Sequence, residues 1–282
     1  MRPDRFLFVV ILVCSARTVT ADVALNPLFG DHSVIQRDKP VTICGTADPD
    51  TPSSLFNGMV APLGGLRVSG ILWYQGEYNT NRHEEYAELF AALISGWRRH
   101  FQEAQLPFYW VQLPNYRGRS DDIPDQKWAA LREVQTRASS IPATGQAVTI
   151  DIGNADDIHP TNKREVGRRL ALVAAAHLNG SSEEWSGPIL EETLSQGNEL
   201  RLTFSHATHG LVVRPAASSG FELAGADGMF HPATARVEAG QLVVTSPQVA
   251  RPKALRYAWR NAPDATLFNA EGLPAGPFRT GP

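Results

Sequence analysis

The stretch AVTIDIGNADDIHPTNKREVGRRLAL, residues 147–172, decides how this chain folds and where its chemistry lies. Its first six residues are mostly apolar or β-branched and predict a strand over 147–152. After a short acidic loop, the pattern predicts a helix over 162–178, with Asn162 as N-cap and Glu165 completing a capping box. A polar loop between a strand and a helix is where open α/β sheets place their ligand sites.

The same rhythm extends upstream of this stretch. Apolar runs predict strands over 68–74 and 108–113, and helical spacing of apolar residues predicts helices over 82–101 and 127–139. Because strands and helices alternate, we expect an α/β fold with a mostly parallel sheet flanked by helices, within residues 51–180.

Beyond residue 180 the pattern changes to short strands separated by Gly, Pro and Asn turns. We expect an all-β sandwich module over 181–282. Its predicted strands are 200–204, 210–213, 233–237, 242–245 and 254–259. Short β-like runs over 22–50 precede a Pro/Asp/Ser-rich joint, and we expect this N-terminal segment to pack on the β module.

The N-terminus has the three parts of a secretory signal peptide. Basic residues precede a short apolar run from Phe6 to Cys14, and small residues follow up to Ala21. We therefore expect residues 1–21 to be removed near Ala21 and the mature protein to be secreted or periplasmic. The alternative is a buried N-terminal strand. Cleavage would leave Cys44 as the one cysteine, which excludes an intrachain disulfide and a Cys-rich metal site.

Charge and hydropathy narrow the range of partners. The net charge is −3 without a basic cluster, so the sequence does not predict nucleic-acid binding. No second apolar stretch approaches the length of a membrane span. Nothing in the sequence calls for a cofactor, and it leaves the oligomeric state open.

His159 is the candidate catalytic base, because Asp156 and Asp157 lie within three residues of it. A nearby carboxylate fixes the tautomer of an imidazole and stabilises its cation. The alternative is an ordinary loop histidine, with the aspartates serving the helix dipole. A metal site that also includes Asp151 is a third option, but the spacing matches no calcium loop, so we predict no metal.

A second polar cluster, WYQGEYN at 73–79, leaves the end of an apolar strand. Gln75 and Asn79 offer amide donors for a developing oxyanion, Gly76 permits close backbone approach, and Glu77 is placed to orient the amides. The alternative is a polar turn that caps the strand. Five aromatic residues suit a sugar-stacking wall, although core burial is their commoner fate. They are Trp73, Tyr74, Tyr78, Tyr116 and Trp128.

These motifs carry a family resemblance. WYQGEYN resembles the signature WYQGESN of bacterial sialate O-acetylesterases, a branch of the SGNH hydrolases. The similarity covers most of the chain. It includes LFGDHSVIQRDKPVTICGTADP (28–49), NGMVAPL (57–63), PFYWVQLPNY (107–116), WAALREVQ (128–135), residues 147–172, FELAGADGMFHPATARV (221–237) and LRYAWRNAP (255–263).

The resemblance implies an SGNH-type, flavodoxin-like α/β domain with β-sandwich modules. It also implies hydrolysis of O-acetyl esters on sialic acid or related sugars. His159 matches the catalytic base, and Asp157 and Asp156 occupy the two positions from which such families orient that ring. Gln75, Gly76 and Asn79 fall in the block that helps to build the oxyanion hole.

One departure from the family decides what activity we expect. The nucleophilic serine lies in a GQSNM-like block, yet here GTADPD (45–50) runs directly into TPSSLFNGM (51–59). The nucleophile and the first strand of the sheet are not found, and Ser53 and Ser54 match positions beyond that block. Tyr78 also replaces the serine of the signature.

Without an attacking hydroxyl, we expect an incomplete sheet and weak or no ester hydrolysis. Two alternatives remain open: a non-catalytic secreted carbohydrate-binding protein, or a gene model that has lost a segment.

Overall fold

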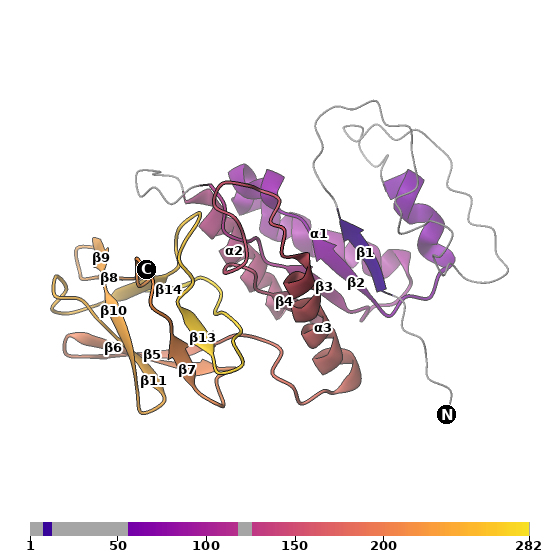
Figure 1. Ribbon diagram of the computed structural model, residues 1–282. Helices are drawn as coiled ribbons and strands as arrows, with labels where there is room; N and C mark the ends of the chain where they lie inside the picture. The colour runs from indigo at the N-terminus through magenta and orange to yellow at the C-terminus, as the bar shows by residue number, and fades with distance from the viewer. Residues whose placement is uncertain (1–7, 13–55, 118–125, 282) are drawn as a thin grey trace.

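The computed structural model describes residues 8–12, 56–117 and 126–281 (Figure 1). It has two parts. A parallel sheet with its helices forms one end of the molecule, and antiparallel sheets form the other. The predicted α/β fold with an all-β module is therefore confirmed.

The parallel sheet has the order β1-β2-β3-β4. Its strands are β1 (Phe8–Leu12), β2 (Gly70–Tyr74), β3 (Phe108–Val111) and β4 (Thr144–Ala147). The helices are α1 (His83–His100), α2 (Lys127–Arg137) and α3 (Lys163–Asn179). Short helical turns are η2 (Phe56–Val60), η3 (Ala61–Gly65), η4 (Glu77–Arg82) and η5 (Ala138–Ser140).

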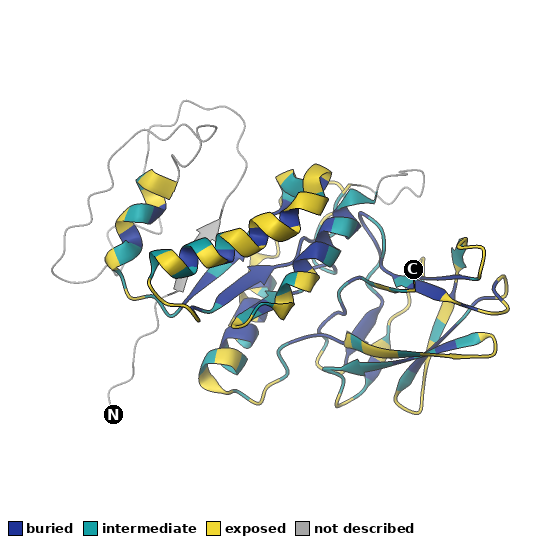
Figure 2. Cartoon of the chain, turned by 180° about the vertical axis from the view of Figure 1, so that it is seen from behind, coloured by how far each residue is buried: buried dark blue, intermediate teal, exposed yellow. Residues whose placement is uncertain are grey.

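The central strand β3 is buried on both faces, as expected for crossovers through helices. Alternate residues point to opposite faces. Ile71 and Trp73 of β2 pack in one cluster with α1 and α2. Tyr109 and Val111 of β3 pack with α3 in a second cluster. Figure 2 shows the outer surfaces of these helices exposed and the sheet between them buried.

The strand predicted over 147–152 is wrong in its bounds, because β4 ends at Ala147. The apolar residues after Ala147, which suggested a longer strand, pack instead against the core of the β module. Ile150 is fully buried in the core cluster of that module, and Val148 packs against the same cluster. The Thr149 hydroxyl donates to the Gln112 carbonyl at 2.6 Å, which ties this turn to the end of β3.

The β module is built from two four-stranded antiparallel sheets and one strand pair. The first sheet has the order β10-β11-β6-β5: β10 (Thr234–Glu238), β11 (Gln241–Thr245), β6 (Glu199–Ser205) and β5 (Ile189–Gln196). The second has the order β14-β12-β8-β9: β14 (Phe278–Thr280), β12 (Ala254–Tyr257), β8 (Phe221–Ala224) and β9 (Phe230–Pro232). The pair is β13 (Leu267–Asn269) and β7 (Leu211–Val213).

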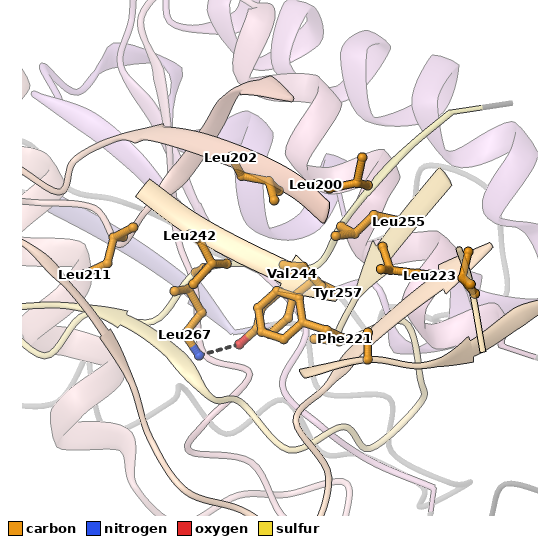
Figure 3. Close-up of a cluster of buried hydrophobic side chains, with 14 of the residues drawn as sticks. Leu200, Leu202, Leu211, Phe221, Leu223, Leu242, Val244, Leu255, Tyr257 and Leu267 are labelled. Carbon is orange, nitrogen blue, oxygen red and sulfur yellow. Dashed lines mark hydrogen bonds between the residues drawn. The ribbon is translucent and has the colours of Figure 1, made fainter. Parts of the chain in front are cut away.

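Side chains from both four-stranded sheets meet in one core (Figure 3). The cluster includes Leu202 and Val244 from the first sheet and Leu223 and Tyr257 from the second. The buried Tyr257 hydroxyl accepts backbone hydrogen bonds from Thr266 at 2.9 Å and Leu267 at 2.8 Å. This polar tip fixes the position of the strand β13 against the sandwich.

The N-terminal expectations are only partly within the described residues. β1 pairs in parallel with β2, with Phe8 opposite Gly70 and Leu12 opposite Tyr74. This strand lies inside the predicted signal peptide, and cleavage near Ala21 would leave β2 at the sheet edge. The segment 22–50 and its predicted packing on the β module lie outside the described residues. Over the described residues, no helix combines the length and apolar character needed to cross a membrane.

Candidate active site

Both polar motifs of the sequence follow the carboxyl ends of strands in the parallel sheet. β2 ends at Tyr74 and leads directly into Gln75, Gly76 and η4. The loop that carries His159 follows β4, and β3 lies between these two strands. Since the strands are parallel, both motifs emerge at the same edge of the sheet, where open α/β folds bind ligands.

Gly76 fixes the turn from β2 into η4. Its backbone has φ 152° and ψ −17°, a region that L-residues rarely adopt. A Cβ at this position would lie 3.1 Å from the Leu131 side chain and 3.2 Å from Gln135 Nε2. Gly76 thus packs closely against α2, while the close backbone approach to a substrate that we predicted there stays a prediction.

The two amides of the motif are hydrogen-bonded to each other. Gln75 Nε2 donates to Asn79 Oδ1 at 2.7 Å. The Gln75 carbonyl in turn accepts from Gln135 Nε2 and the Tyr86 hydroxyl, both at 3.3 Å. With its oxygen occupied, Asn79 presents its Nδ2 group as a donor, which is what an oxyanion site requires. The two amides thus orient each other, and the orienting role that we predicted for Glu77 stays a prediction.

Burial raises the pKa of the Glu77 carboxyl above its ordinary value, while its own and the Gly76 backbone N–H groups, Lys163 and His159 oppose that rise. The flanks of the two motifs lie close together, because the Lys163 ammonium, in the first turn after the His159 loop, is 4.9 Å from the ring centroid of Tyr74, which directly precedes Gln75.

Lys163 is a member of this site that the sequence analysis missed. It begins α3, four residues after His159, and its ammonium lies 4.9 Å from the Tyr74 ring centroid. Burial and the Glu77 charge raise the pKa of the Tyr74 hydroxyl well above its ordinary range. Lys163 therefore places a cation over the Tyr74 ring, and its charge also acts on the half-buried Glu77 carboxyl. Its position in the first turn of the helix after His159 is the signal that could have indicated it.

Asp157 is the carboxylate nearest to the candidate base. Its Oδ1 accepts the His159 backbone N–H at 2.8 Å and lies 3.5 Å from the ring nitrogen Nδ1. The two side chains are 65% and 57% exposed, in the order His159 and Asp157. The Asp156 backbone N–H donates to Asn154 Oδ1 at 2.9 Å. Of the two candidate aspartates, Asp157 is therefore the one in contact with the ring.

The base of the His159 loop is anchored by Arg169, a second residue that the sequence analysis missed. Its nearly buried guanidinium forms a bidentate pair with Asp151, at 2.6 and 2.8 Å. It also donates to the Val148 carbonyl at 2.7 Å and to Glu165 at 2.9 Å. Bidentate pairs of this kind add geometric specificity, so Arg169 fixes the start of the loop relative to α3.

The predicted capping box at the start of α3 is half confirmed. Asn162 Oδ1 accepts the Glu165 backbone N–H at 3.2 Å, as an N-cap should. The Glu165 carboxylate does not return this bond, because it pairs with Arg168 and Arg169. The two guanidinium groups hold the pKa of the Glu165 carboxyl at about 2.

The aromatic residues of the predicted sugar-stacking wall have different positions. Trp73 and Trp128 are buried in the core beside α1 and α2. Tyr78 is 84% exposed on η4, beside Glu77 and Asn79. The reading of these tryptophans as core residues is confirmed, and Tyr78 is the aromatic side chain that the site presents to solvent.

The described residues supply no attacking hydroxyl to His159. Within residues 56–117 and 126–281, no serine is hydrogen-bonded to the His159 ring. Ser53 and Ser54 lie outside the described residues. In the same described part of the chain, His, Cys, Asp and Glu side chains form no group of three or more that could hold a metal ion.

Comparisons with known proteins point to one group of enzymes. Residues 52–176 match the family model described as carbohydrate esterase, sialic acid-specific acetylesterase. The chain is 31% identical to sialate O-acetylesterase of Rattus norvegicus over 261 residues, which are 82% of this chain and 48% of that protein. It is 33% identical to sialate O-acetylesterase of Homo sapiens over 175 residues, which are 55% of this chain and 34% of that protein.

A solved structure is also similar. The crystal structure of a novel carbohydrate acetylesterase from Xanthomonas citri aligns with a TM-score of 0.75 and 46% sequence identity. The alignment covers 80% of this chain and 53% of that one. The chain thus spans about half the length of the relatives that it matches.

Proposed function

Because the chain belongs to the sialic acid-specific acetylesterase family of carbohydrate esterases, we propose that it acts on O-acetyl esters of sialic acid or related sugars. One observation carries the proposal. The Gln75–Asn79 motif and the His159 loop both follow the carboxyl ends of parallel strands at one edge of the sheet, and Lys163, four residues after His159, lies over the Tyr74 ring that precedes Gln75. A base and neutral amide donors within one site are the parts that ester hydrolysis uses.

The roles of the residues follow from their chemistry. In a serine esterase, a hydroxyl attacks the acetyl carbonyl while an imidazole takes its proton. His159 is the imidazole of this site, and Asp157, 3.5 Å from its Nδ1, is the carboxylate placed to orient the ring. Asn79 Nδ2 is a donor for the oxyanion of the tetrahedral intermediate, with Gln75 holding the amide in place.

We further propose that hydrolysis by this chain is impaired. GTADPD runs directly into TPSSLFNGM, with no nucleophile block between them. Without a hydroxyl within about 2.6–3.2 Å of the base, no acyl-enzyme forms. The base and the oxyanion donors alone sustain only a slow reaction through water.

The test measures acetate release from two esters, with the His159→Ala variant and a serine-directed inhibitor as the two comparisons. We expect slow release of acetate from O-acetylated sialic acid and from p-nitrophenyl acetate. That rate should fall further in His159→Ala and be insensitive to a serine-directed fluorophosphonate. An ordinary esterase rate that the fluorophosphonate abolishes would show that a nucleophilic serine is present. Sequencing the junction between Asp50 and Thr51 in the source DNA separates a true deletion from a faulty gene model.

A second candidate function is glycan binding without catalysis. The exposed Tyr78 ring beside the amide pair favours it, because an exposed aromatic face and amide groups suit a sugar. In that case, binding of acetylated sialic acid persists in His159→Ala and no ester cleavage is seen in either chain. Loss of binding in His159→Ala, together with loss of turnover, would favour the esterase.

We also propose that the protein is exported. The support is the basic start, the apolar run and the small residues before Ala21. N-terminal sequencing of the protein purified from the medium or periplasm tests this, and an intact Met1 would contradict it.

A further inference from the structure

The β module has a hollow of about 520 Å³ that is separate from the His159 site. Three loops surround it: residues 217–220 before β8, residues 232–234 between β9 and β10, and residues 258–264 after β12. Small-molecule sites in proteins commonly have volumes of roughly 300–1,000 Å³. The hollow is therefore large enough for one or two sugar rings.

The walls of the hollow combine one aromatic ring with hydroxyl and charged groups. Trp259 is half-buried and supplies a broad apolar surface. Ser218 and Thr234 contribute hydroxyls, and Arg260 and Asp264 contribute one charge of each sign. A pyranose ring has an apolar C–H face and a rim of hydroxyls, so this mixture of surfaces complements it. The Arg260 guanidinium is paired with Glu222 at 3.3 Å, so the walls offer no uncompensated cation for an acidic ligand, which suits a neutral sugar.

The walls are held in place before any ligand binds. The Arg279 guanidinium lies 4.8 Å from the Trp259 ring centroid and is itself paired with Glu133 of α2, at 2.8 and 3.0 Å. The Ser218 backbone N–H donates to Asp264 Oδ2 at 3.4 Å, which joins two of the three loops. A site that is ordered beforehand loses little entropy when a ligand binds.

One of these loops also contacts the α/β domain. The Asn261 carbonyl accepts from Arg132 Nη2 at 2.7 Å and from the Tyr116 N–H at 3.2 Å. Asn261 Oδ1 accepts the Trp128 N–H at 3.1 Å. Tyr116 follows the carboxyl end of β3, the sheet edge at which the candidate active site lies. These bonds fix the loop that lines the hollow relative to the α/β domain that carries the candidate active site.

We propose that this hollow binds a neutral sugar ring of an oligosaccharide, as an accessory site with Trp259 as its stacking platform. The proposal deepens the carbohydrate-directed function proposed above, since it names where the rest of the glycan is held. It does not depend on turnover, because no residue of the hollow belongs to the site around His159.

The test measures binding in a chain that carries His159→Ala, so that ester cleavage plays no part. The probes are N-acetyllactosamine, xylotetraose and 3′-sialyllactose, followed by saturation-transfer NMR and calorimetry. We expect at least one of the two neutral probes to bind, and Trp259→Ala to weaken it ten-fold or more. Ala217→Trp, which fills the exposed rim while keeping Trp259, should weaken it similarly. Met229→Ala, exposed on the same module but outside the hollow, should leave binding unchanged.

Because binding is measured in the His159→Ala chain, its result is independent of the result of the esterase assay. Binding that survives both Trp259→Ala and Ala217→Trp would overturn the proposal, as would failure of both neutral probes to bind. Binding of 3′-sialyllactose alone would also overturn it, because the ligand class would then be acidic. If Trp259→Ala does not fold, Ala217→Trp alone decides.

Discussion

Arg132 joins the α/β domain to the β module, and its replacement should destabilise the protein strongly. Its side chain is fully buried in α2. Nε donates to the Leu113 carbonyl at 2.7 Å and Nη2 to the Pro114 carbonyl at 2.6 Å, both in the α/β domain. Nη1 donates to the Arg260 carbonyl at 2.9 Å and Nη2 to the Asn261 carbonyl at 2.7 Å, both in the β module. Burial lowers the pKa of Arg132 to about 9, so the guanidinium remains charged at neutral pH.

The expected loss for Arg132→Met can be worked out from these contacts. The Pro114 carbonyl keeps the Trp128 indole as a donor, and the Asn261 carbonyl keeps the Tyr116 N–H. The loss therefore falls mainly on the carbonyls of Leu113 and Arg260. A buried group that loses its partner costs about 1–3 kcal/mol, which gives about 2–6 kcal/mol for two. Methionine fills most of the space and removes the desolvated charge, so we expect about 3 kcal/mol.

Urea unfolding at neutral pH measures the change in free energy, and calorimetry should show a fall in Tm of roughly 6–12 °C. The matched control is Arg137→Met on the same helix, whose side chain is 65% exposed and pairs with Glu133. An exposed ion pair contributes about 0–1 kcal/mol, so this variant should stay close to the wild type. Arg132→Met with stability within about 1 kcal/mol of the control would refute the reasoning, because the four bonds would then carry no net free energy.

Three further predictions concern single groups. Pairing with Arg168 and Arg169 lowers the pKa of the Glu165 carboxyl to about 2, so this pairing stabilises the folded protein above about pH 4.5, and the stabilisation is lost as the pH falls from there toward 2. Glu165→Gln should therefore flatten this part of the curve of unfolding free energy against pH. An unchanged slope in the variant would contradict the pairing. Gly76→Ala should lower the free energy of unfolding, measured in urea, by about 1–3 kcal/mol, because the backbone conformation is strained for alanine and the new Cβ would lie 3.1 Å from the Leu131 side chain. An unchanged free energy of unfolding would show that the turn relaxes without cost. Tyr257→Phe should lower the free energy of unfolding by about 1–3 kcal/mol, because the buried N–H groups of Thr266 and Leu267 lose their acceptor. The control Tyr78→Phe, at an exposed position, should change it by less than about 0.5 kcal/mol.

Long periodic segments made the α/β half of the fold predictable. The helix expected over 82–101 is α1, and the helix expected over 162–178 is α3, each displaced by about one residue at either end. Apolar periodicity identifies a helix because one face must be buried against the sheet. The bounds of β4 were not predictable in this way, since Ile150 is buried in the β module and sequence periodicity does not show which core a residue joins.

The strands β5 and β8 were missed for opposite reasons. β5, Ile189–Gln196, is an edge strand with most of its side chains exposed, so it lacks a buried alternate face. β8, Phe221–Ala224, is buried throughout and is too short to give a pattern. Both are strands because of long-range pairing, β5 with β6 and β8 with β12, which a local pattern does not contain.

The candidate site was predictable where it depends on local motifs. His159 with Asp157, and Gln75 with Asn79, are neighbours in sequence and proved to be neighbours in space. Their supports were not predictable. Arg169 reaches back 18 residues to Asp151, and its role depends on how α3 packs on the sheet.

The supporting contacts of the site are made by residues downstream of residue 56. The turn at Gly76 packs against Leu131 and Gln135 of α2, and the start of the His159 loop is held by Arg169 of α3. The absence of the nucleophile block that we propose would therefore leave the arrangement of His159, Asp157, Gln75 and Asn79 in place. For this reason we expect the chain to retain binding of O-acetylated sialic acid where its turnover is slow.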